Sequence, residues 1–404
     1  MENVKQEVFK ERMIDVYNRI KDITSFLPTS IRTVLEKELN TMKELIIDAR
    51  PPRFAFVGRR GAGKSSLLNA IFGTKLAEIG PVKAKTIIGK WYSYEQSKGK
   101  MEILDTRGLE EGTNPEEALS DYKKCLDEKL PDVFLFLCKA KEVDAHINDD
   151  IENLIELYEY VKNKYDYEIP IVTIVTQSDE VDDIMDKTPP YETKKEEYIN
   201  VAKMHLHDLV IRKVPNSIYS IAVSEHIKFD DNGNIITDSR WHINELLDLL
   251  LKHIPESAQL ELAKIGQMKS LQKSMAKKIV GISAAICSAI AAEPIPGIDL
   301  PFITGVQLSM IIGIGYIGGY NMDKETAIKF LTAMGINIGA AFVFREIARA
   351  IIKLIPVFGN IVSMGMAAAG TYSIGAAAIA YLIDKKSEDE SKTILNDGLG
   401  KIKE

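Results

Sequence analysis

The residues best suited to chemistry lie in one stretch, Gly58–Ser66, whose sequence is GRRGAGKSS. Its three glycines allow a tight turn in which successive N–H groups point at phosphate oxygens. Lys64 can reach β- and γ-phosphates, and the Ser65 hydroxyl can complete a magnesium shell. We therefore expect a nucleotide to be held by Gly58, Gly61, Ala62, Gly63, Lys64, Ser65 and Ser66.

The segments around this stretch match that role. Residues 54–57 before it are apolar and predict a strand, and residues 67–72 after it predict a helix. A phosphate-binding loop requires this strand–loop–helix context. The alternative, an ordinary glycine turn, does not need it.

A second group of candidates follows a predicted strand at residues 100–105, with the sequence DTRG at residues 105–108. Asp105 would hold magnesium through its water shell, and the Gly108 N–H could bond the γ-phosphate and sense its presence. Thr86 lies between the two groups, and its hydroxyl would reach the same ion. The expected metal ligands are thus Ser65, Thr86 and Asp105.

A third group, TQSD at residues 176–179, ends another apolar strand. The Asp179 carboxylate can accept two hydrogen bonds from the N1 and N2 edge of guanine, which adenine cannot donate. A helix cap is the alternative role for Asp179. Thr176 and Gln177 would accompany it at the base, and Ala222 or Val223 would offer a backbone N–H to guanine O6.

The elements that must position these groups alternate between strand and helix from residue 53 to about residue 255. This alternation indicates a doubly wound α/β domain with a mostly parallel six-stranded sheet. The strands at 133–138 and 169–175 are almost wholly apolar, as expected for strands covered on both faces. The predicted strands are 53–57, 87–94, 100–105, 133–138, 169–176 and 217–222.

Bulk composition narrows the possible partners. The chain has 404 residues, a net charge of −7 and three cysteines without a metal-binding or disulfide spacing. Length allows two or three domains, the charge does not favour a nucleic-acid partner, and the cysteines fit a reducing compartment. The N-terminus is too charged for a signal peptide. We expect a cytoplasmic protein, with association at a membrane surface as an open possibility.

Helices are predicted on both sides of the α/β domain. Residues 1–48 contain two amphipathic repeats, and residues 279–383 are poor in charge. We therefore predict three segments: N-terminal helices at 1–50, the α/β domain at 51–255, and an apolar helical domain at 256–404 that packs with the first.

Two apolar runs, 302–320 and 361–383, are long enough to cross a bilayer of ~30 Å. Their glycine and alanine content lowers the transfer energy and permits close helix packing in water or in lipid. Three interpretations remain open: a helical bundle with a buried Gly/Ala core, reversible membrane attachment, and spanning helices.

Taken together, GRRGAGKS, DTRG and TQSD resemble the motifs of Era/TrmE-like and immunity-related GTPases, over about residues 51–255. The resemblance implies a P-loop GTPase that binds GTP or GDP with Mg²⁺ and hydrolyses GTP. It also implies a nucleotide-dependent homodimer or oligomer.

Two residues depart from that pattern. Gln177 replaces the lysine whose stem packs over guanine, and Leu109 replaces the glutamine that orients the attacking water in Ras-type relatives. Since leucine cannot orient water, Arg59 or Arg60 is a candidate for stabilising charge, in cis or in trans. The alternative for both arginines is plain solvent exposure. The expected catalytic residues are Lys64, Thr86, Gly108, Arg59 and Arg60.

Residues 279–383 resemble a helical domain of unknown function that follows GTPase domains in many bacterial proteins, which is often described as membrane-associated. The similarity rests on PIPGIDLPFITGVQLSMIIGIGYIGGY and IPVFGNIVSMGMAAAGTYSIGAAAIAYL. The resulting hypothesis is a GTPase whose nucleotide state controls self-association or membrane attachment. The alternatives are a scaffold or membrane tether that binds GTP without hydrolysis and, with less support, an ATP-using P-loop protein.

Overall fold

The structure is a computed structural model of the chain, and it divides into two compact units. Unit 2 contains Pro51–Gly266, and unit 1 combines Met1–Arg50 with Gln267–Glu404. The residues described are 11, 14, 15, 17–22, 24, 25, 28–59, 61–75, 90–96, 99–105, 115–143, 147–182, 187–214, 218–266, 269–292, 299–321, 323–335 and 364–400.

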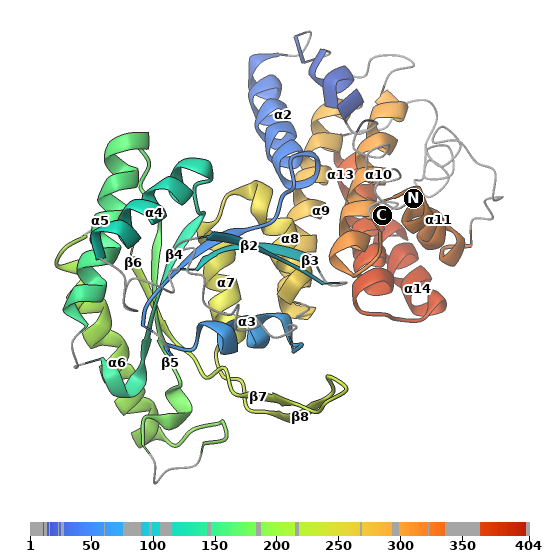
Figure 1. Cartoon of the computed structure of the whole chain (residues 1–404). Coiled ribbons are helices and arrows are strands. Elements are labelled where there is room, and N and C mark those ends of the chain that lie inside the picture. Colours follow the sequence, from blue (N-terminus) through green and yellow to red (C-terminus); the bar gives the residue numbers. More distant parts are fainter. Residues whose placement is uncertain are drawn as a thin grey trace. The chain divides into compact units, whose positions relative to one another are not determined.

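Unit 2 contains a six-stranded sheet with the strand order β2-β3-β1-β4-β5-β6 (Figure 1). Strand β2 pairs antiparallel with β3, and the other neighbours pair in parallel. This arrangement confirms the predicted doubly wound fold. The strands are β1 (Arg53–Val57), β2 (Lys90–Gln96), β3 (Gly99–Asp105), β4 (Val133–Lys139), β5 (Ile171–Thr176) and β6 (Ile218–Ala222).

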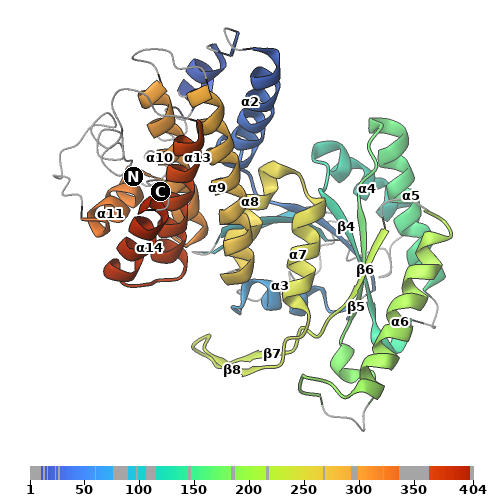
Figure 2. The same cartoon turned by 180° about the vertical axis from the view of Figure 1, so that it is seen from behind.

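Helices cover both faces of the sheet. Helices α4, α5 and α6 lie on one face, and α3, α7 and α8 lie on the other (Figures 1 and 2). Every residue of β5 is buried, because both of its faces are covered. The helices are α3 (Lys64–Phe72), α4 (Pro115–Glu128), α5 (Asn148–Tyr165), α6 (Thr193–Ile211), α7 (Ile243–His253) and α8 (Glu256–Gly266).

A small second sheet was not predicted. Strands β7 (Ile227–Phe229) and β8 (Ile235–Asp238) form an antiparallel hairpin. Gly233, with φ of +82°, lies in its turn. The signal for it was present in the sequence, because Asn232-Gly233 between two apolar segments is a strong hairpin pattern.

The boundary between the units differs from the one expected after Pro255. Helix α8 packs with the sheet of unit 2: the Lys100 N–H donates to Glu261 at 3.4 Å, and a Cβ at Gly99 would lie 2.7 Å from Ile265. This close packing against β3 places α8 in unit 2, so the boundary lies after Gly266.

Unit 1 is helical and contains segments from both ends of the chain. Leu35 and Leu39 of α2 are buried, as the predicted apolar repeat requires, and α2 packs against α9. The helices among the described residues are α2 (Thr29–Met42), η1 (Lys43–Ile47), α9 (Lys269–Ala292), α10 (Asp299–Ile317), α11 (Lys324–Ala333), α13 (Met364–Ala378), η4 (Ile379–Ile383) and α14 (Glu388–Gly400).

Small residues allow these helices to approach closely. A Cβ at Gly375 of α13 would collide with Val280 of α9. Buried polar groups also pair across the unit: the Gln307 Nε2 donates to Thr371 Oγ1 at 2.9 Å, and the Gln272 Nε2 donates to the Ile317 carbonyl at 2.8 Å. Polar pairs of this kind fix which helices are neighbours, because an unpaired buried amide is costly.

Two described helices, Lys269–Ala292 and Gly365–Ile383, are long and apolar enough to cross a membrane by length and composition. In both, 67% of the apolar window is buried within the structure, as is common for core helices. The predicted run 302–320 is helical only as far as Ile317, where α10 ends, and Gly319 adopts φ of +89°. Residues 361–363, at the start of the second predicted run, lie outside the described residues.

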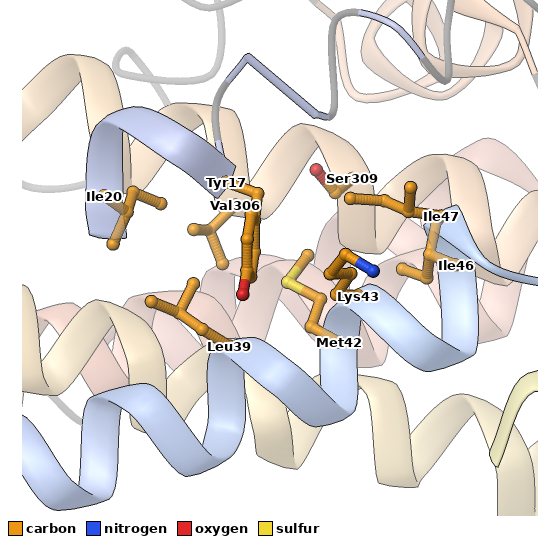
Figure 3. A pocket seen from close by; sticks show the side chains of 9 residues that line it. All are labelled: Tyr17, Ile20, Leu39, Met42, Lys43, Ile46, Ile47, Val306 and Ser309. Carbon is orange, nitrogen blue, oxygen red and sulfur yellow. The ribbon is translucent and has the colours of Figure 1, made fainter. Parts of the chain in front are cut away.

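A small apolar hollow lies within unit 1 between η1, α2, α10 and the first helical residues (Figure 3). Its volume is about 20 Å³, which is room for about one water molecule. Tyr17 and Lys43 at this hollow have partners of their own: the Tyr17 hydroxyl donates to Asn40 at 2.9 Å, and the Lys43 ammonium pairs with Asp48 at 2.5 Å. The hollow is a packing gap and is too small for a nucleotide.

Candidate nucleotide site

The predicted phosphate loop follows the carboxyl end of β1, beside the ends of two neighbouring strands. Phe56 pairs with Asp105 of β3, and Val57 pairs with Phe136 of β4. In an open parallel sheet, ligands bind at this carboxyl edge where the connections diverge. The sheet therefore brings the phosphate loop and the backbone of Asp105 to one edge.

Glycine is required in this loop. Gly58, Gly61 and Gly63 have φ of +142°, +81° and +85°, which side chains rarely allow. A Cβ at Gly58 would also collide with the Leu137 carbonyl of β4. The loop is a cradle of backbone that a side chain would fill, and this shape fits a bound polyphosphate.

Helix α3 starts at Lys64, directly after this cradle, and no described side chain caps its first turn. The first turn of a helix leaves N–H groups without intrahelical partners and carries a partial positive charge, which together attract anions. Ser65 and Ser66 are exposed on this turn. The exposed Ser65 hydroxyl is available as a magnesium ligand.

Lys64 is buried, with 8% of its surface exposed, and its side chain folds back along the loop. The ammonium donates to the carbonyls of Gly58 and Arg59, the latter at 3.0 Å. These bonds hold the lysine charge within the cradle, where phosphate oxygens would approach.

The candidate arginine Arg59 is held by α5. Its Nε donates to the Asp150 carboxylate at 2.7 Å, and only 10% of the Asp150 side chain is exposed. A role for Arg59 in stabilising transferred charge requires this ion pair to open. Plain solvent exposure, the alternative interpretation, does not describe Arg59 either.

The third candidate group lies against the phosphate loop. The Thr176 hydroxyl donates to the Ala62 carbonyl at 3.0 Å, and the Gln177 Nε2 donates to the Gly61 carbonyl at 3.0 Å. Two side chains at the end of β5 thus tie residues 176–179, here called the base loop, to the phosphate loop. The sequence contained both residues, but their role in joining the loops was not predicted.

Asp179 is buried at 5% exposure and is held on two sides. Its Oδ1 accepts a hydrogen bond from the Ser224 hydroxyl at 3.0 Å, and the Lys195 ammonium donates to its backbone carbonyl at 2.6 Å. Lys195 is fully buried and lies over the Tyr191 ring at 4.5 Å. The carboxylate is therefore preorganised by a neighbouring loop, which is not the arrangement of a helix cap.

Of the two backbone N–H groups expected to face guanine O6, that of Val223 is already used. Ala222 is paired with Val175 in the sheet, and the Val223 N–H donates to the Val175 carbonyl at 2.8 Å. Val223 therefore does not offer the expected donor for guanine O6, and Ala222 stays the candidate. The loop that reaches the site begins one residue later, at Ser224.

Glu225 was missed by sequence reasoning. It is 4% exposed, and its Oε2 accepts a hydrogen bond from the Gln177 N–H at 3.0 Å. Burial, the largest cause, raises the pKa of Glu225 to about 7, with further contributions from Asp179 and Glu180. Nothing in the sequence around Glu225 indicates this, because its neighbours come from β5 and the phosphate loop.

The remaining candidates lie outside the described residues: Arg60, Thr86, Gly108 and Leu109. Asp105 ends β3 beside Phe56, and only its backbone is described. Within the described ranges, no group of three or more His, Cys, Asp or Glu side chains could hold a metal ion by itself. Of the three expected magnesium ligands, Ser65 is the one whose side chain the structure describes, and the nucleotide phosphates would supply further oxygens.

Comparison with known proteins identifies the class that this fold and site define. Residues 53–177 match the 50S ribosome-binding GTPase family, and residues 257–404 match a domain of unknown function, DUF697. The chain thus carries a P-loop GTPase domain followed by a DUF697 region.

Individual relatives match about a third of the chain. Translocase of chloroplast 34 from Pisum sativum is 29% identical over 134 residues, which are 33% of this chain and 41% of that protein. The probable GTP-binding protein EngB from Aquifex aeolicus is 25% identical over 135 residues, which are 32% of this chain and 67% of that protein. Neither is an immunity-related GTPase, so only the broader class is retained.

Among solved structures, Toc33 from Arabidopsis thaliana is similar with a TM-score of 0.36 and 17% identity. The match covers 60% of this chain and 94% of Toc33.

Proposed function

We propose that this chain binds a guanine nucleotide with Mg²⁺ and hydrolyses GTP to GDP and phosphate. The observation that carries the proposal is the pair of bonds from Thr176 and Gln177 to the carbonyls of Ala62 and Gly61. They hold a polyphosphate cradle and a base-recognising carboxylate, Asp179, at a fixed separation, as one nucleotide requires.

Guanine is the proposed base because Asp179 is a buried acceptor. Guanine presents two N–H donors to such a carboxylate, whereas adenine would leave it unpaired in a buried place. The bond from Ser224 occupies one lone pair of Oδ1 and orients the carboxylate without neutralising it. Gln177 supplies no charged stem over the base, so we expect selectivity for guanine with modest affinity.

For hydrolysis, Lys64 would stabilise charge on the transferred phosphoryl group, and Ser65 with Asp105 would hold Mg²⁺. Bound Mg²⁺ would neutralise charge on the β- and γ-oxygens. Thr86 and Gly108 would sense the γ-phosphate. We expect a low intrinsic rate, because Leu109 cannot orient water and Arg59 is paired with Asp150.

Leu109 and the Arg59–Asp150 ion pair also favour a second candidate function. It is a nucleotide-gated scaffold or membrane tether that binds GTP with little turnover. In both cases we propose that the nucleotide state acts on the helical unit, changing self-association or its attachment to a membrane surface. The membrane part of this proposal is motivated by the segments Lys269–Ala292 and Gly365–Ile383, which are long and apolar enough to cross a membrane although 67% of each apolar window is buried.

Turnover by the purified protein separates these functions. GTP and ATP are compared across a series of protein concentrations, with Lys64→Ala as the control. GTP turnover that rises per molecule with concentration supports an assembly-stimulated GTPase, and Arg59→Ala and Arg60→Ala then locate the stimulating charge. Tight GTP binding without turnover at any concentration supports the scaffold. Turnover of ATP alone contradicts guanine selectivity.

The effect on the helical unit is tested by light scattering and by flotation with anionic lipid vesicles, each with GDP and with a non-hydrolysable GTP analogue. We expect a larger particle or stronger vesicle binding in the GTP-like state. The same size and the same flotation in both states would contradict nucleotide control.

A further inference from the structure

Glu225 occupies a buried place between the two loops of the nucleotide site. Its own loop is held firmly, because the backbones of Ser224 and Trp241 exchange hydrogen bonds of 3.1 and 2.9 Å. The Glu225 side chain therefore has little freedom to leave its place. Its two carboxyl oxygens face different loops.

The first oxygen, Oε2, is hydrogen-bonded to the base loop. Glu225 Oε2 accepts the Gln177 N–H at 3.0 Å, at a residue whose φ is +52°. A non-glycine residue rarely adopts this conformation, so a carboxylate acceptor on its N–H helps to keep it there. Because Gln177 also bonds the Gly61 carbonyl, Glu225 supports the joint between the two loops.

The second oxygen, Oε1, faces the phosphate loop at Gly63. A Cβ at Gly63 would collide with it. Among the described residues Oε1 has no hydrogen-bond partner, although it is fully buried. A buried carboxyl oxygen without a donor is costly, more so when the group is ionised.

The charges around this carboxyl add to that cost. Burial is the largest cause of the pKa near 7 of Glu225, and the negative charges of Asp179 and of Glu180, the residue after the base loop, raise it further. The ammonium of Lys64 is bound to loop carbonyls, and that of Lys139, at the end of β4, pairs with Glu142 at 2.8 Å. His226, the next residue along the chain, lies 4.0 Å from Asp179.

We propose that Glu225 is a positioning residue through which proton binding is coupled to nucleotide binding. The inference rests on the proposed nucleotide function. With its proton, the carboxyl fills the space below Gly63 without charge and still accepts the Gln177 N–H. Without the proton, it places a buried negative charge behind the loop that must receive anionic phosphates, where low dielectric strengthens repulsion.

Thermodynamic linkage between proton binding and nucleotide binding gives the direction of the pH dependence. Since phosphate favours the protonated form, nucleotide binding takes up a proton wherever free Glu225 is ionised. Affinity therefore falls as pH rises through about 7, by about tenfold per pH unit at most. A residue that only filled space would not produce this dependence.

The test compares wild type, Glu225→Gln and Glu180→Gln. Affinity for fluorescent GDP is measured with saturating Mg²⁺ between about pH 5.5 and pH 8.5. We expect the wild-type affinity to fall across this range more steeply than that of Glu225→Gln. Glu180→Gln is the matched control. Its GDP affinity should fall as steeply as that of wild type, with the midpoint of the fall at a lower pH, because one negative charge near Glu225 is removed. Titration of GDP itself affects all three proteins equally.

Proton uptake on nucleotide binding can be measured on the wild-type protein alone. Titration calorimetry of GDP binding to wild type at about pH 8, in two buffers of different ionisation enthalpy, should show net uptake of a proton. Zero uptake, or pH profiles of wild type and Glu225→Gln that coincide while both bind GDP, overturns the inference and leaves the proposed function standing. Failure of wild type to bind guanine nucleotide at any pH overturns the proposed function and this inference with it.

Discussion

At the scale of single residues, the site depends on side chains that bond backbone of another loop. Thr176 and Gln177 both donate to carbonyls of the phosphate loop. Ser224 orients Asp179 in the same indirect way. The geometry of the cradle is thus set by residues that need not touch the phosphates, and a small steric change in the cradle should disturb it.

Gly63→Ala tests that sensitivity. The new Cβ would collide with Glu225 at a residue whose φ is +85°. We expect GDP affinity to fall by about a hundredfold or more, because the cradle must distort. Gly233→Ala is a matched control, since Gly233 has φ of +82° but nothing within 4 Å. Both variants bear a similar backbone cost of about 1–2 kcal/mol, so equal loss of affinity would contradict the steric explanation.

The titration of Glu225 also predicts a pH dependence of stability. Its pKa is about 7 in the folded protein, above its ordinary value of 4.5. The stabilisation from its proton is complete below about pH 4.5 and is lost as pH rises through about 7. Chemical unfolding of wild type and Glu225→Gln should therefore show a difference that changes by about 1.4 kcal/mol per pH unit at most. A difference that does not vary with pH in this window would argue against the burial of a titrating carboxyl.

At the scale of elements, small residues determine how closely the helices of unit 1 can approach one another. A Cβ at Gly375 of α13 meets Val280 of α9, whereas Gly365 on the same helix has nothing within 4 Å. We expect Gly375→Ala to lower the unfolding free energy by about 1–3 kcal/mol through overpacking. Gly365→Ala should be neutral or stabilising by up to about 1 kcal/mol, because alanine favours helix. Thermal unfolding of both variants checks this, and equal effects would exclude the overpacking mechanism.

The elements of unit 2 were largely predictable, because strands covered on both faces are apolar throughout and helices begin at recognisable positions. Strand β1 has the predicted bounds, and β3 and β4 differ from the predicted strands by one residue at one end. The hairpin β7–β8 was missed despite its Asn-Gly turn. The part played by Glu225 was not predictable, since it depends on Gly63 and Gln177, which are distant in the chain.

At the scale of the whole molecule, the boundary after Gly266 predicts which fragment of the chain can fold alone. Leu260, Leu262 and Ile265 of α8 are fully buried, and α8 packs against α3, α7 and β3. Removing this helix exposes apolar surface worth about 1.5–3 kcal/mol for each large side chain.

We therefore expect a fragment of residues 51–266 to fold and bind guanine nucleotide about as well as the full chain. A fragment of residues 51–255 should unfold at lower denaturant concentration or aggregate. Circular dichroism during urea titration and GDP binding compare the two. Equal stability of both fragments would show that α8 contributes nothing to unit 2.

The two-part origin of the helical unit has a consequence for synthesis. Helix α2 leaves the ribosome before unit 2, but its partner α9 follows only after Gly266. At about 5–20 residues per second, the apolar face of α2 waits for roughly ten to forty seconds while the GTPase domain is made. The nascent chain thus exposes Leu35 and Leu39 to chaperones during that interval, while unit 2 is already able to fold.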